Sequence, residues 1–388
     1  MSCKKYFDIP QPAPICAGTG LLALDLVINK DKKTEPKLCA GGSCGNVLAI
    51  LSYLGWEAYP IARLTKDAAA EEIRNDLNHF NVKLDLVESD ASGSTPIIIE
   101  QISAKQDGTP THSFRLVCPN CGIHFPRYKP ILVQKSRQLT GKLPEIKTFY
   151  FDKLSAGAIE LARIMRERGA LVVFEPSSIG NQSLFERALS VCHVFKYAGD
   201  RLGHVKELAE ELIPILQIET LGIQGLKYRL KVRNKQQKRW EVMPAFKVDS
   251  LRDAAGCGDW CTAGIIHLLG WHGSAKLESA LKNEIDDALQ FGQALAALNC
   301  YFEGARGGMY ALTKEELKQA VEEIMQGNKP EFDVPDSLSE DSNDILLRIC
   351  PNCAKQQAIS LTESKEVRKV SLTSSSADNT PNIFTQPA

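Results

Sequence analysis

Residues 252–264 read RDAAGCGDWCTAG, in which two glycines and an aspartate stand directly before an apolar helical pattern. The glycines let the backbone turn tightly and approach a ligand, and the following helix points free N–H groups and its positive dipole end at that ligand. We therefore predict that Gly256, Cys257 and Gly258 form a cradle for the charge on a transferring phosphoryl group. Asp259 has two readings: it accepts the proton of an attacking hydroxyl, or it only caps the helix, and its spacing does not decide between them.

The chain around this stretch has the pattern of an α/β fold. From about residue 147 apolar strands alternate with helices, with strands at 147–151, 170–176, 191–197 and 217–222 and helices at 156–168, 182–190 and 203–213. Such alternation favours a parallel sheet covered on both faces. Nearer the N-terminus, we predict one buried strand with a glycine break over residues 15–28 and a hairpin over 95–118 that turns at Asp107-Gly108.

Bulk properties narrow the classes of function. The chain has 388 residues and a net charge of -1, which gives no general attraction to nucleic acid or to anionic membranes. No apolar run reaches the roughly 18 residues that cross a bilayer, and the N-terminal segment MSCKKYFDIPQPAP lacks the apolar core of a secretory signal. We expect a cytoplasmic protein that contacts neither membrane nor nucleic acid.

A second glycine-rich segment lies near the N-terminus, at residues 41–55, and forms a pair of motifs with the first. Residues 41–55, GGSCGNVLAILSYLG, resemble the N-terminal signature of the ribokinase-like (PfkB-type) sugar and nucleoside kinases, and RDAAGCGDWCTAG resembles their C-terminal signature. The resemblance runs over roughly residues 14–325 and includes Asp25, FEPSS at 174–178 and ETLGIQG at 219–225. It implies a three-layer α/β/α sandwich with a mostly parallel central sheet and a small β-rich lid.

The resemblance also assigns roles to individual residues. Asp25 and Asn46 would bind substrate hydroxyls, and Gly41 and Gly42 would let the backbone approach the substrate. Asp259 would be the catalytic base beside an anion hole of Gly256, Cys257 and Gly258. The nucleotide would lie against Thr220, Gly222, Gly225, Asp253 and Asn299. The alternatives are structural: a buried cap for Asp25 and a helix-surface amide for Asn46.

Part of the family pattern is altered. The family usually carries Asn-x-x-Glu, which organises Mg²⁺ and phosphate, after the strand that here reads VCHVFKY. The equivalent positions in this chain are Ala198 and Arg201, and Asp200 could replace the acid only at a different spacing. The signature threonine is Ala254 and the usual alanine is Cys257. We therefore expect the base to be kept, with activity that is slow, differently dependent on metal, or absent.

Cysteines give two further hypotheses. RLVCPNCG at 115–122 and RICPNCA at 348–354 are matching Cys-x-x-Cys turns, and we predict one structural Zn²⁺ held by Cys118, Cys121, Cys350 and Cys353, with two free or redox-active dithiols as the alternative. The zinc would attach the C-terminal segment to the lid hairpin. At a helix N-terminus the pKa of the Cys257 thiol would be lowered, so that oxidation or alkylation would block phosphate binding; alternatively Cys257 only fills the alanine position.

Together these observations predict the organisation and two functions. Residues 1–327 would form the kinase domain, with a lid mainly from about 30–40 and 95–128, followed by an acidic linker and zinc knuckle at 328–360 and a disordered tail at 361–388. Residues 226–233 alternate apolar and basic side chains and are interpreted as an edge strand with a solvated basic face, or as a polyanion-binding surface.

The first function that we predict is an ATP- and Mg²⁺-dependent kinase that phosphorylates a hydroxyl of a sugar, sugar derivative or nucleoside. The second is a kinase-fold protein that binds nucleotide or a partner with little turnover. The family lid often forms a dimer clasp, so a homodimer through the lid is one alternative for the assembly.

Overall fold

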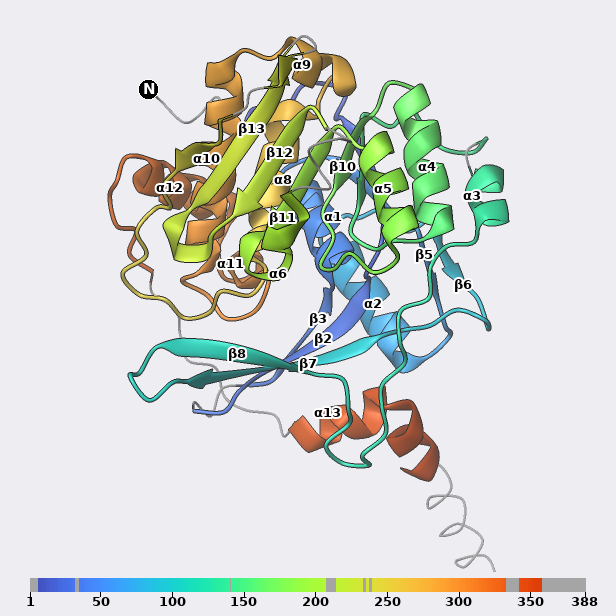
Figure 1. Ribbon diagram of the computed structural model, residues 1–388. Helices are drawn as coiled ribbons and strands as arrows, with labels where there is room; N and C mark the ends of the chain where they lie inside the picture. The colour runs from blue at the N-terminus through green and yellow to red at the C-terminus, as the bar shows by residue number, and fades with distance from the viewer. Residues whose placement is uncertain are drawn as a thin grey trace, which may run out of the picture.

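The computed structural model describes residues 6–31, 35–139, 141–206, 214–232, 235–236, 239–332 and 342–357 (Figure 1). The predicted tail at 361–388 and parts of the expected lid and acidic linker lie outside these residues. A large central sheet has the strand order β14-β13-β12-β11-β10-β9-β1-β4. The strands from β4 to β12 are parallel: β4 (Glu57–Pro60), β1 (Ile15–Thr19), β9 (Thr148–Phe151), β10 (Leu171–Phe174), β11 (Val194–Ala198) and β12 (Leu216–Thr220).

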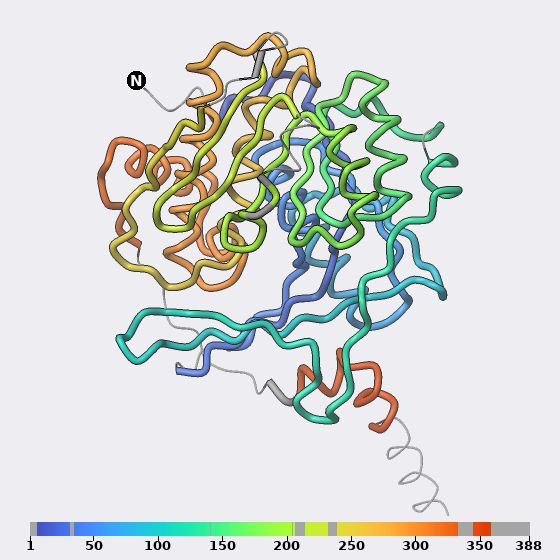
Figure 2. Tube along the Cα trace, in the orientation of Figure 1, coloured from blue at the N-terminus to red at the C-terminus, as the bar shows by residue number. Residues whose placement is uncertain are grey.

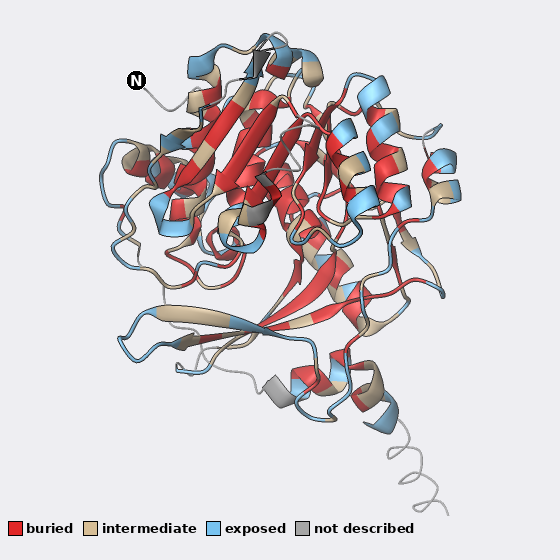
Figure 3. Cartoon of the chain, in the orientation of Figure 1, coloured by how far each residue is buried: buried red, intermediate tan, exposed pale blue. Residues whose placement is uncertain are grey.

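Alternating side chains on these strands bury both faces of the sheet. Phe149 and Phe151 belong to one apolar core, while Tyr150 between them belongs to the other. The first core is covered by α3 (Val133–Leu139), α4 (Ala156–Glu167) and α5 (Gln182–Val191). The second is covered by α1 (Ser43–Tyr53), α8 (Cys257–Leu269), α10 (Lys282–Asn299) and α12 (Lys314–Met325). Figure 3 shows the central strands as buried, and the predicted three-layer sandwich with a mostly parallel sheet is confirmed.

A second sheet, the lid, has the order β3-β2-β7-β8 and lies below the central sheet in Figure 1. Its strands are β3 (Lys37–Gly41), β2 (Ala23–Asn29), β7 (Ile97–Ala104) and β8 (Pro110–Arg115). The Gly108 N–H donates to the Lys105 carbonyl (2.9 Å), so the predicted hairpin turn at Asp107-Gly108 is confirmed. β8 pairs with β7 and stands at the edge of the lid.

The single strand predicted over residues 15–28 is wrong, because its two halves belong to different sheets. β1 ends at Thr19 in the central sheet, and β2 starts at Ala23 in the lid. Gly20 makes the break with a φ of 157°, and a Cβ there would lie 1.6 Å from Asp152 Oδ1. The glycine break is therefore a change of sheet rather than a kink within one strand.

The prediction for residues 226–233 is also wrong in part. β13 (Leu226–Val232) is not an edge strand, since it pairs with β12 on one side and with β14 (Lys235–Gln236) and β15 (Glu241–Met243) on the other. Its basic face is not wholly solvated: Arg229 is buried, donates to Gln217 (2.6 Å), and lies over the Trp240 ring. Arg233 lies outside the described residues.

The remaining elements connect these layers. α2 begins after the N-cap Asp67 and packs behind the lid, and α13 packs against α2. Figure 2 shows the red C-terminal segment beside the teal loop that follows β8. The other bounds are α2 (Ala68–His79), β5 (Ala62–Leu64), β6 (Val87–Ser89), α6 (Gly199–Leu202), α9 (Ser274–Ser279), α11 (Gly307–Ala311) and α13 (Ser342–Ile349). Within the part of the chain that is described, no helix has both the length and the apolar character needed to cross a bilayer.

Candidate active site

A pocket of about 790 Å³ lies between the carboxyl ends of the central strands and the lid. Ligands of open α/β sheets bind at this edge, so the position fits a binding site. Its lining includes three groups of residues, together with the start of α1 and the ends of β9 to β11. The lid contributes Asp25, Ile98, Glu100, His112, Phe114 and Leu116; the loops after β11 and β12 contribute Ala198, Asp200, Arg201, Thr220 and Gly222; and the start of α8 contributes Gly256, Gly258 and Asp259.

The reading of Asp259 as a helix cap is wrong, and its role as the base stays a prediction. The N-cap of α8 is Gly256, and no side chain makes a capping hydrogen bond there. Asp259 instead accepts a hydrogen bond from Asn46 Nδ2 of α1 at 2.7 Å, across the floor of the pocket. Asn46 is only 3% exposed, so it is not a helix-surface amide either. Two residues from the two glycine-rich segments therefore meet at one point.

The surroundings of Asp259 suit proton transfer. Burial raises the pKa of its carboxyl to about 7, and the nearby Glu175 carboxylate adds to this rise. The hydrogen bond from Asn46 and the positive charge of Lys196 act in the opposite direction. A carboxyl with a pKa near the working pH is well matched to a general base, because its proton is readily gained and lost.

The backbone beside Asp259 forms a cradle for an anion. Gly256 has a φ of 70°, and a Cβ at this position would lie 2.2 Å from the Ala305 carbonyl oxygen, so only glycine fits. Among the described residues, the N–H groups of Gly258 and Asp259 have no hydrogen-bond acceptor. They stand in the first turn of α8, where the helix dipole adds positive potential. The predicted cradle thus has two free donors turned to the end of the helix that attracts anions.

Asp25 lies on the lid side of the same pocket. It is 7% exposed, and burial raises the pKa of its carboxyl to about 7 against the opposing charge of Arg306. Its Oδ1 atom has no hydrogen-bond partner within the described chain, which leaves an acceptor for a ligand hydroxyl. Gly42 lines the pocket with a φ of 78°. Gly41 does not line it: a Cβ there would lie 1.8 Å from Asp25 Oδ2, so this glycine makes room for Asp25.

The residues assigned to the nucleotide fall into two groups. Thr220 and Gly222 line the pocket, whereas Gly225, Asp253 and Asn299 do not. Asn299 Nδ2 donates to the carbonyls of Ala255 (3.0 Å) and Gly304 (3.3 Å), so its amide joins the two loops behind the cradle. A nucleotide contact for these three residues stays a prediction.

Asp253 connects the cradle loop to the lid. Its carboxylate accepts the N–H groups of Ala255 (3.0 Å) and Gly304 (2.9 Å) and lies 2.8 Å from His112 Nδ1 of β8. Burial alone would raise the pKa of Asp253, but the hydrogen bonds from His112, Glu100 and the two N–H groups outweigh it and hold the pKa below its usual value. Burial raises the pKa of Glu100 to about 10, so this carboxyl is neutral at pH 7 and can donate to Asp253.

Two charged residues of the pocket were not predicted from the sequence. Lys196 of β11 is almost fully buried, and its Nζ donates to the Gly258 carbonyl (3.1 Å) and to Glu175 Oε1. Glu175, which follows β10, also accepts from the Thr262 hydroxyl. Both residues line the pocket, so a buried Lys–Glu ion pair lies under the cradle. The sequence does contain a signal for these two residues. Each is a charged residue inside or next to a buried apolar strand, VCHVFKY or FEPSS, and charged residues are rarely buried unless they are paired.

The altered element faces the pocket on its other side. Ala198, Asp200 and Arg201 all line the pocket at the start of α6. Asp200 and Arg201 are exposed, in contrast to the buried Asp259 and Asn46. This side of the pocket therefore carries one carboxylate and one guanidinium with solvent access.

The hypothesis of an activated Cys257 thiol is wrong. Cys257 points away from the pocket lining, towards Cys300 Sγ at 3.2 Å and the Ala296 carbonyl at 3.4 Å. The hydrogen bond with Cys300, together with burial, raises the pKa of Cys257 well above its usual value. The local contact outweighs the helix dipole, so Cys257 behaves as a small buried residue in the alanine position. Its pairing with Cys300, 43 residues away, was not visible in the sequence.

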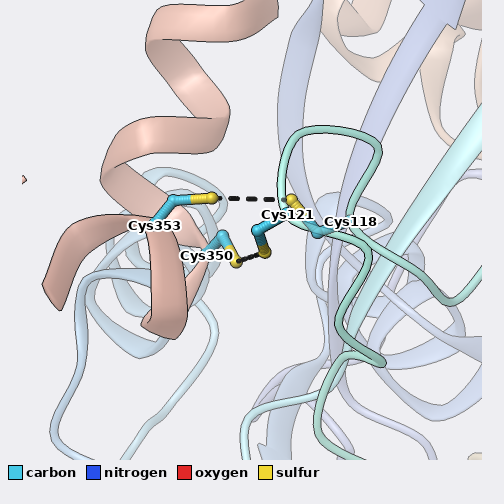
Figure 4. A group of neighbouring side chains, drawn as sticks. All are labelled: Cys118, Cys121, Cys350 and Cys353. Atoms are coloured by element: carbon cyan, nitrogen blue, oxygen red, sulfur yellow. Dashed lines mark hydrogen bonds between the residues drawn. The ribbon is translucent and has the colours of Figure 1, made fainter. Parts of the chain in front are cut away.

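The four predicted metal ligands do come together. Cys118 and Cys121 from the loop after β8 face Cys350 and Cys353 from the C-terminal segment (Figure 4). Their sulfur atoms all lie within 4.8 Å of one another, and none of the four residues lines the pocket.

Comparisons with known proteins agree with this architecture. No protein-family model and no curated protein matches the chain. Among solved structures, aminoimidazole riboside kinase from Salmonella enterica, complexed with aminoimidazole riboside and an ATP analogue, is similar with a TM-score of 0.59 and 20% identity over 79% of this chain and 99% of that one. Fructokinase from Xylella fastidiosa with bound ATP gives a TM-score of 0.59 and 17% identity over 81% of this chain and 97% of that one.

A nucleoside kinase has the same likeness. The Burkholderia thailandensis enzyme in complex with inosine gives a TM-score of 0.57 and 16% identity over 82% of this chain and 100% of that one. These similarities extend over nearly the whole length of each neighbour, at identities that establish the fold alone. The chain has the ribokinase-like fold of these sugar and nucleoside kinases.

Proposed function

We propose that this protein is an ATP-dependent kinase that transfers the γ-phosphoryl group to a hydroxyl of a sugar, a sugar derivative or a nucleoside. The observation that carries the proposal is the meeting of Asp259, Asn46 and two free backbone N–H groups at the floor of one pocket. The fold supports it, because the similar structures are kinases of this class.

The residues of the pocket support a simple sequence of events. Asp25 and Asn46 orient the acceptor, and the Asp259 carboxylate takes the proton of the attacking hydroxyl. The N–H groups of Gly258 and Asp259 stabilise the charge on the transferring phosphoryl group, and Lys196, which is paired with Glu175, holds the loop beneath them through the Gly258 carbonyl. Deprotonated Asp259 is available above its pKa of about 7.

The opposite wall of the pocket can hold Mg²⁺, but with one protein carboxylate as its ligand. Mg²⁺ in phosphotransferases is held by one or two carboxylates together with substrate phosphates and water. Asp200 is the exposed carboxylate on that wall and would hold the ion, while Ala198 and Arg201 offer it no ligand. When bound with ATP, Mg²⁺ would neutralise charge on the phosphates. Arg201 can supply part of the same neutralisation from this chain.

The lid supports a hydroxylated acceptor with an apolar face. Phe114 and Leu116 line the pocket although they are 57% and 55% exposed. Large apolar side chains in a pocket contact apolar or aromatic parts of a ligand, and a few polar groups fix its orientation. Asp25 and Asn46 supply the polar contacts to hydroxyl groups.

A second function rests on the altered wall. Without the Asn-x-x-Glu element the protein would bind nucleotide or a partner and would have little or no turnover. Ala198 and Arg201 in the pocket lining favour this alternative.

A transfer assay separates the two functions. Purified full-length protein with ATP and Mg²⁺ is incubated with a panel of sugars and nucleosides, and mass spectrometry detects the phosphorylated acceptor while ADP formation is measured in parallel. We expect at least one acceptor to gain a phosphoryl group with matching ADP.

The control is Asp259→Asn, which keeps the size of the side chain and removes the base. Transfer that survives unchanged in this variant would refute Asp259 as the base. Binding of ATP and acceptor by calorimetry without transfer would support the second function instead.

A further inference from the structure

Four thiols meet between the lid and the C-terminal segment, and none of them lines the pocket. Cys118, Cys350 and Cys353 are at most 3% exposed, and Cys121 is half-buried. Cys118 Sγ lies 3.7 Å from Cys353 Sγ, and Cys121 Sγ lies 3.7 Å from Cys350 Sγ. The two turns are separated by more than 200 residues in the chain, yet each contributes one thiol to each close pair (Figure 4).

These separations match a metal tetrahedron. With Zn–S bonds of about 2.3 Å, the sulfur–sulfur edge of a tetrahedral Cys₄ site is about 3.8 Å. Both close pairs stand at 3.7 Å, and all four sulfur atoms lie within 4.8 Å of one another. A disulfide needs about 2.05 Å, and it would join two sulfur atoms rather than gather four.

The backbone holds the two turns in shape. In the first, the Cys118 N–H donates to the Ile123 carbonyl and the Gly122 N–H to the Cys118 carbonyl, both at 2.9 Å, and Gly122 has a φ of 73°. In the second, Cys350 follows the last residue of α13, and its carbonyl accepts the Ala354 N–H at 3.0 Å. Each turn therefore presents its two thiols on one side.

The C-terminal partner is itself fixed to the body of the protein. α13 buries Ile345, Leu346 and Ile349 and forms an ion pair from Arg348 to Glu72 of α2. α2 in turn holds the lid and the pocket loops, since Asp76 accepts the Ala40 N–H (2.9 Å) and the Arg306 guanidinium.

The other partner is the free end of the lid. β8 is an edge strand whose exposed Phe114 lines the pocket, and Leu116 follows it. The Phe125 N–H donates to the Leu116 carbonyl at 2.9 Å, which places the first cysteine turn directly beyond β8. A bond between the two turns would therefore fasten the end of β8 to α13 and α2.

We propose that Cys118, Cys121, Cys350 and Cys353 bind one structural Zn²⁺ and that this ion fixes the end of β8 over the pocket. Four cysteine ligands complete the coordination, so the ion has no open position for chemistry. The effect on acceptor binding rests on the proposed kinase function, whereas zinc binding and the order of β8 do not.

Metal content is the first test. Full-length protein purified without added metal should contain about one zinc per chain by mass spectrometry of the metal. Titration with an organomercurial should release this zinc as four thiols react, which tests the native protein without any variant. Cobalt in place of zinc should give the visible absorption of a tetrahedral thiolate site.

Variants locate the ion. Cys350→Ser with Cys353→Ser should lose zinc, whereas Cys192→Ser, a change at a buried cysteine elsewhere, should keep it. Native protein without zinc, or a double variant that retains it, would overturn the site. Two intact disulfides in non-reducing peptide mapping would overturn it as well.

Hydrogen exchange tests the effect on the lid. In the double variant, exchange of residues 110–125 should speed up about tenfold or more, while α4 on the far side of the sheet is unchanged. If transfer is observed, the KM for the acceptor should rise about fivefold and the KM for ATP should stay within twofold. If zinc is bound but exchange at 110–125 is unchanged in the double variant, the ion does not fix the end of β8. Zinc content and hydrogen exchange can both be measured even if the protein has no kinase activity.

Discussion

The two walls of the pocket are built differently. The acceptor wall, defined as Asp25, Asn46, Gly256, Gly258 and Asp259, has three buried polar side chains, and two of them, Asn46 and Asp259, are joined by a direct hydrogen bond. The nucleotide wall, defined as Ala198, Asp200, Arg201, Thr220 and Gly222, has exposed charges at Asp200 and Arg201.

The difference indicates which wall tolerates change. Burial shifts the pKa of Asp25 and of Asp259 to about 7, and the free N–H groups sit on the same wall. On the other wall, phosphates and metal ions bring much of their own charge, so exposed side chains contribute less and can be exchanged. We expect substitutions on the acceptor wall to have the larger effects.

The largest effect is expected from Asp259→Asn. Loss of the base should lower kcat about 10³-fold, within the range of general-base catalysis. The matched change on the nucleotide wall, Asp200→Asn, should lower kcat about tenfold at most. Steady-state kinetics with saturating ATP measure kcat for both variants. Equal losses of kcat would show that the two walls do not differ in their importance for catalysis.

The same variant, Asp259→Asn, should lose activity but gain thermal stability at high pH. The pKa of Asp259 is raised in the folded protein, so the carboxyl binds its proton more tightly than in the unfolded chain, and folding is penalised as pH rises from about 4 to 7. At pH 8 the Asn variant should melt a few degrees higher than the wild type, and near pH 4 the two should coincide. A variant that melts lower at pH 8 would argue against a buried charge.

The pH dependence of activity is the next largest effect. Because Asp259 must be ionised, kcat/KM should fall about tenfold per unit below pH 7, and somewhat more steeply where Asp25 also takes up its proton. The affinity for ATP should vary less over the same range. Initial rates from pH 5.5 to 8.5 at fixed ionic strength test this. A profile that does not change with pH would show that activity does not require ionised Asp25 or Asp259.

A smaller effect is expected at the lid. His112 joins β8 to Asp253 behind the cradle at 2.8 Å, so His112→Ala should raise the KM for the acceptor about five- to tenfold with little change in kcat. His124→Ala changes an exposed histidine of the same segment and is the control. Equal behaviour of the two variants would show that the contact with Asp253 does not hold the lid.

The smallest effect is expected on the nucleotide wall. Arg201→Glu places a carboxylate at the position where the family usually has glutamate, and it should lower the Mg²⁺ concentration for half-maximal rate about threefold. Arg201→Gln removes the charge without adding a ligand and should not lower it. If neither variant changes the Mg²⁺ dependence, Arg201 lies too far from the metal to matter.

The sequence predicted the residues that depend on local backbone geometry. Gly256 and Gly42 have φ values of 70° and 78°, and such positions leave a visible mark because other residues avoid them. The alternation of apolar strands and helices likewise predicted the three layers. Gly41 was predicted for the wrong reason, because the atom that approaches it is Asp25 Oδ2 and no local pattern reports that contact.

The contacts that the analysis missed join distant segments. Lys196 and Glu175 are 21 residues apart and lie on neighbouring strands, and their pairing follows from strand order rather than from either local pattern. The Cys257 thiol was assigned from the helix dipole alone, and the contact with Cys300 reversed the direction of its pKa shift. In both cases the chemistry of the residue depends on a neighbour in space that its local sequence does not contain.

By itself, the sequence determined the fold class, the two glycine-rich turns and the matching cysteine turns, because these depend on periodicity and on backbone conformations that few residues adopt. Only the tertiary structure decided that Asp259 meets Asn46 across 213 residues and that Asp253 meets His112 across 141. The meeting of the four thiols was predicted from the sequence, and the structure brings their sulfur atoms within 4.8 Å of one another. The physical reason is that burial, charge and hydrogen bonding act between neighbours in space. The packing of the sheet and the lid fixes those neighbours, and no local stretch of sequence contains them.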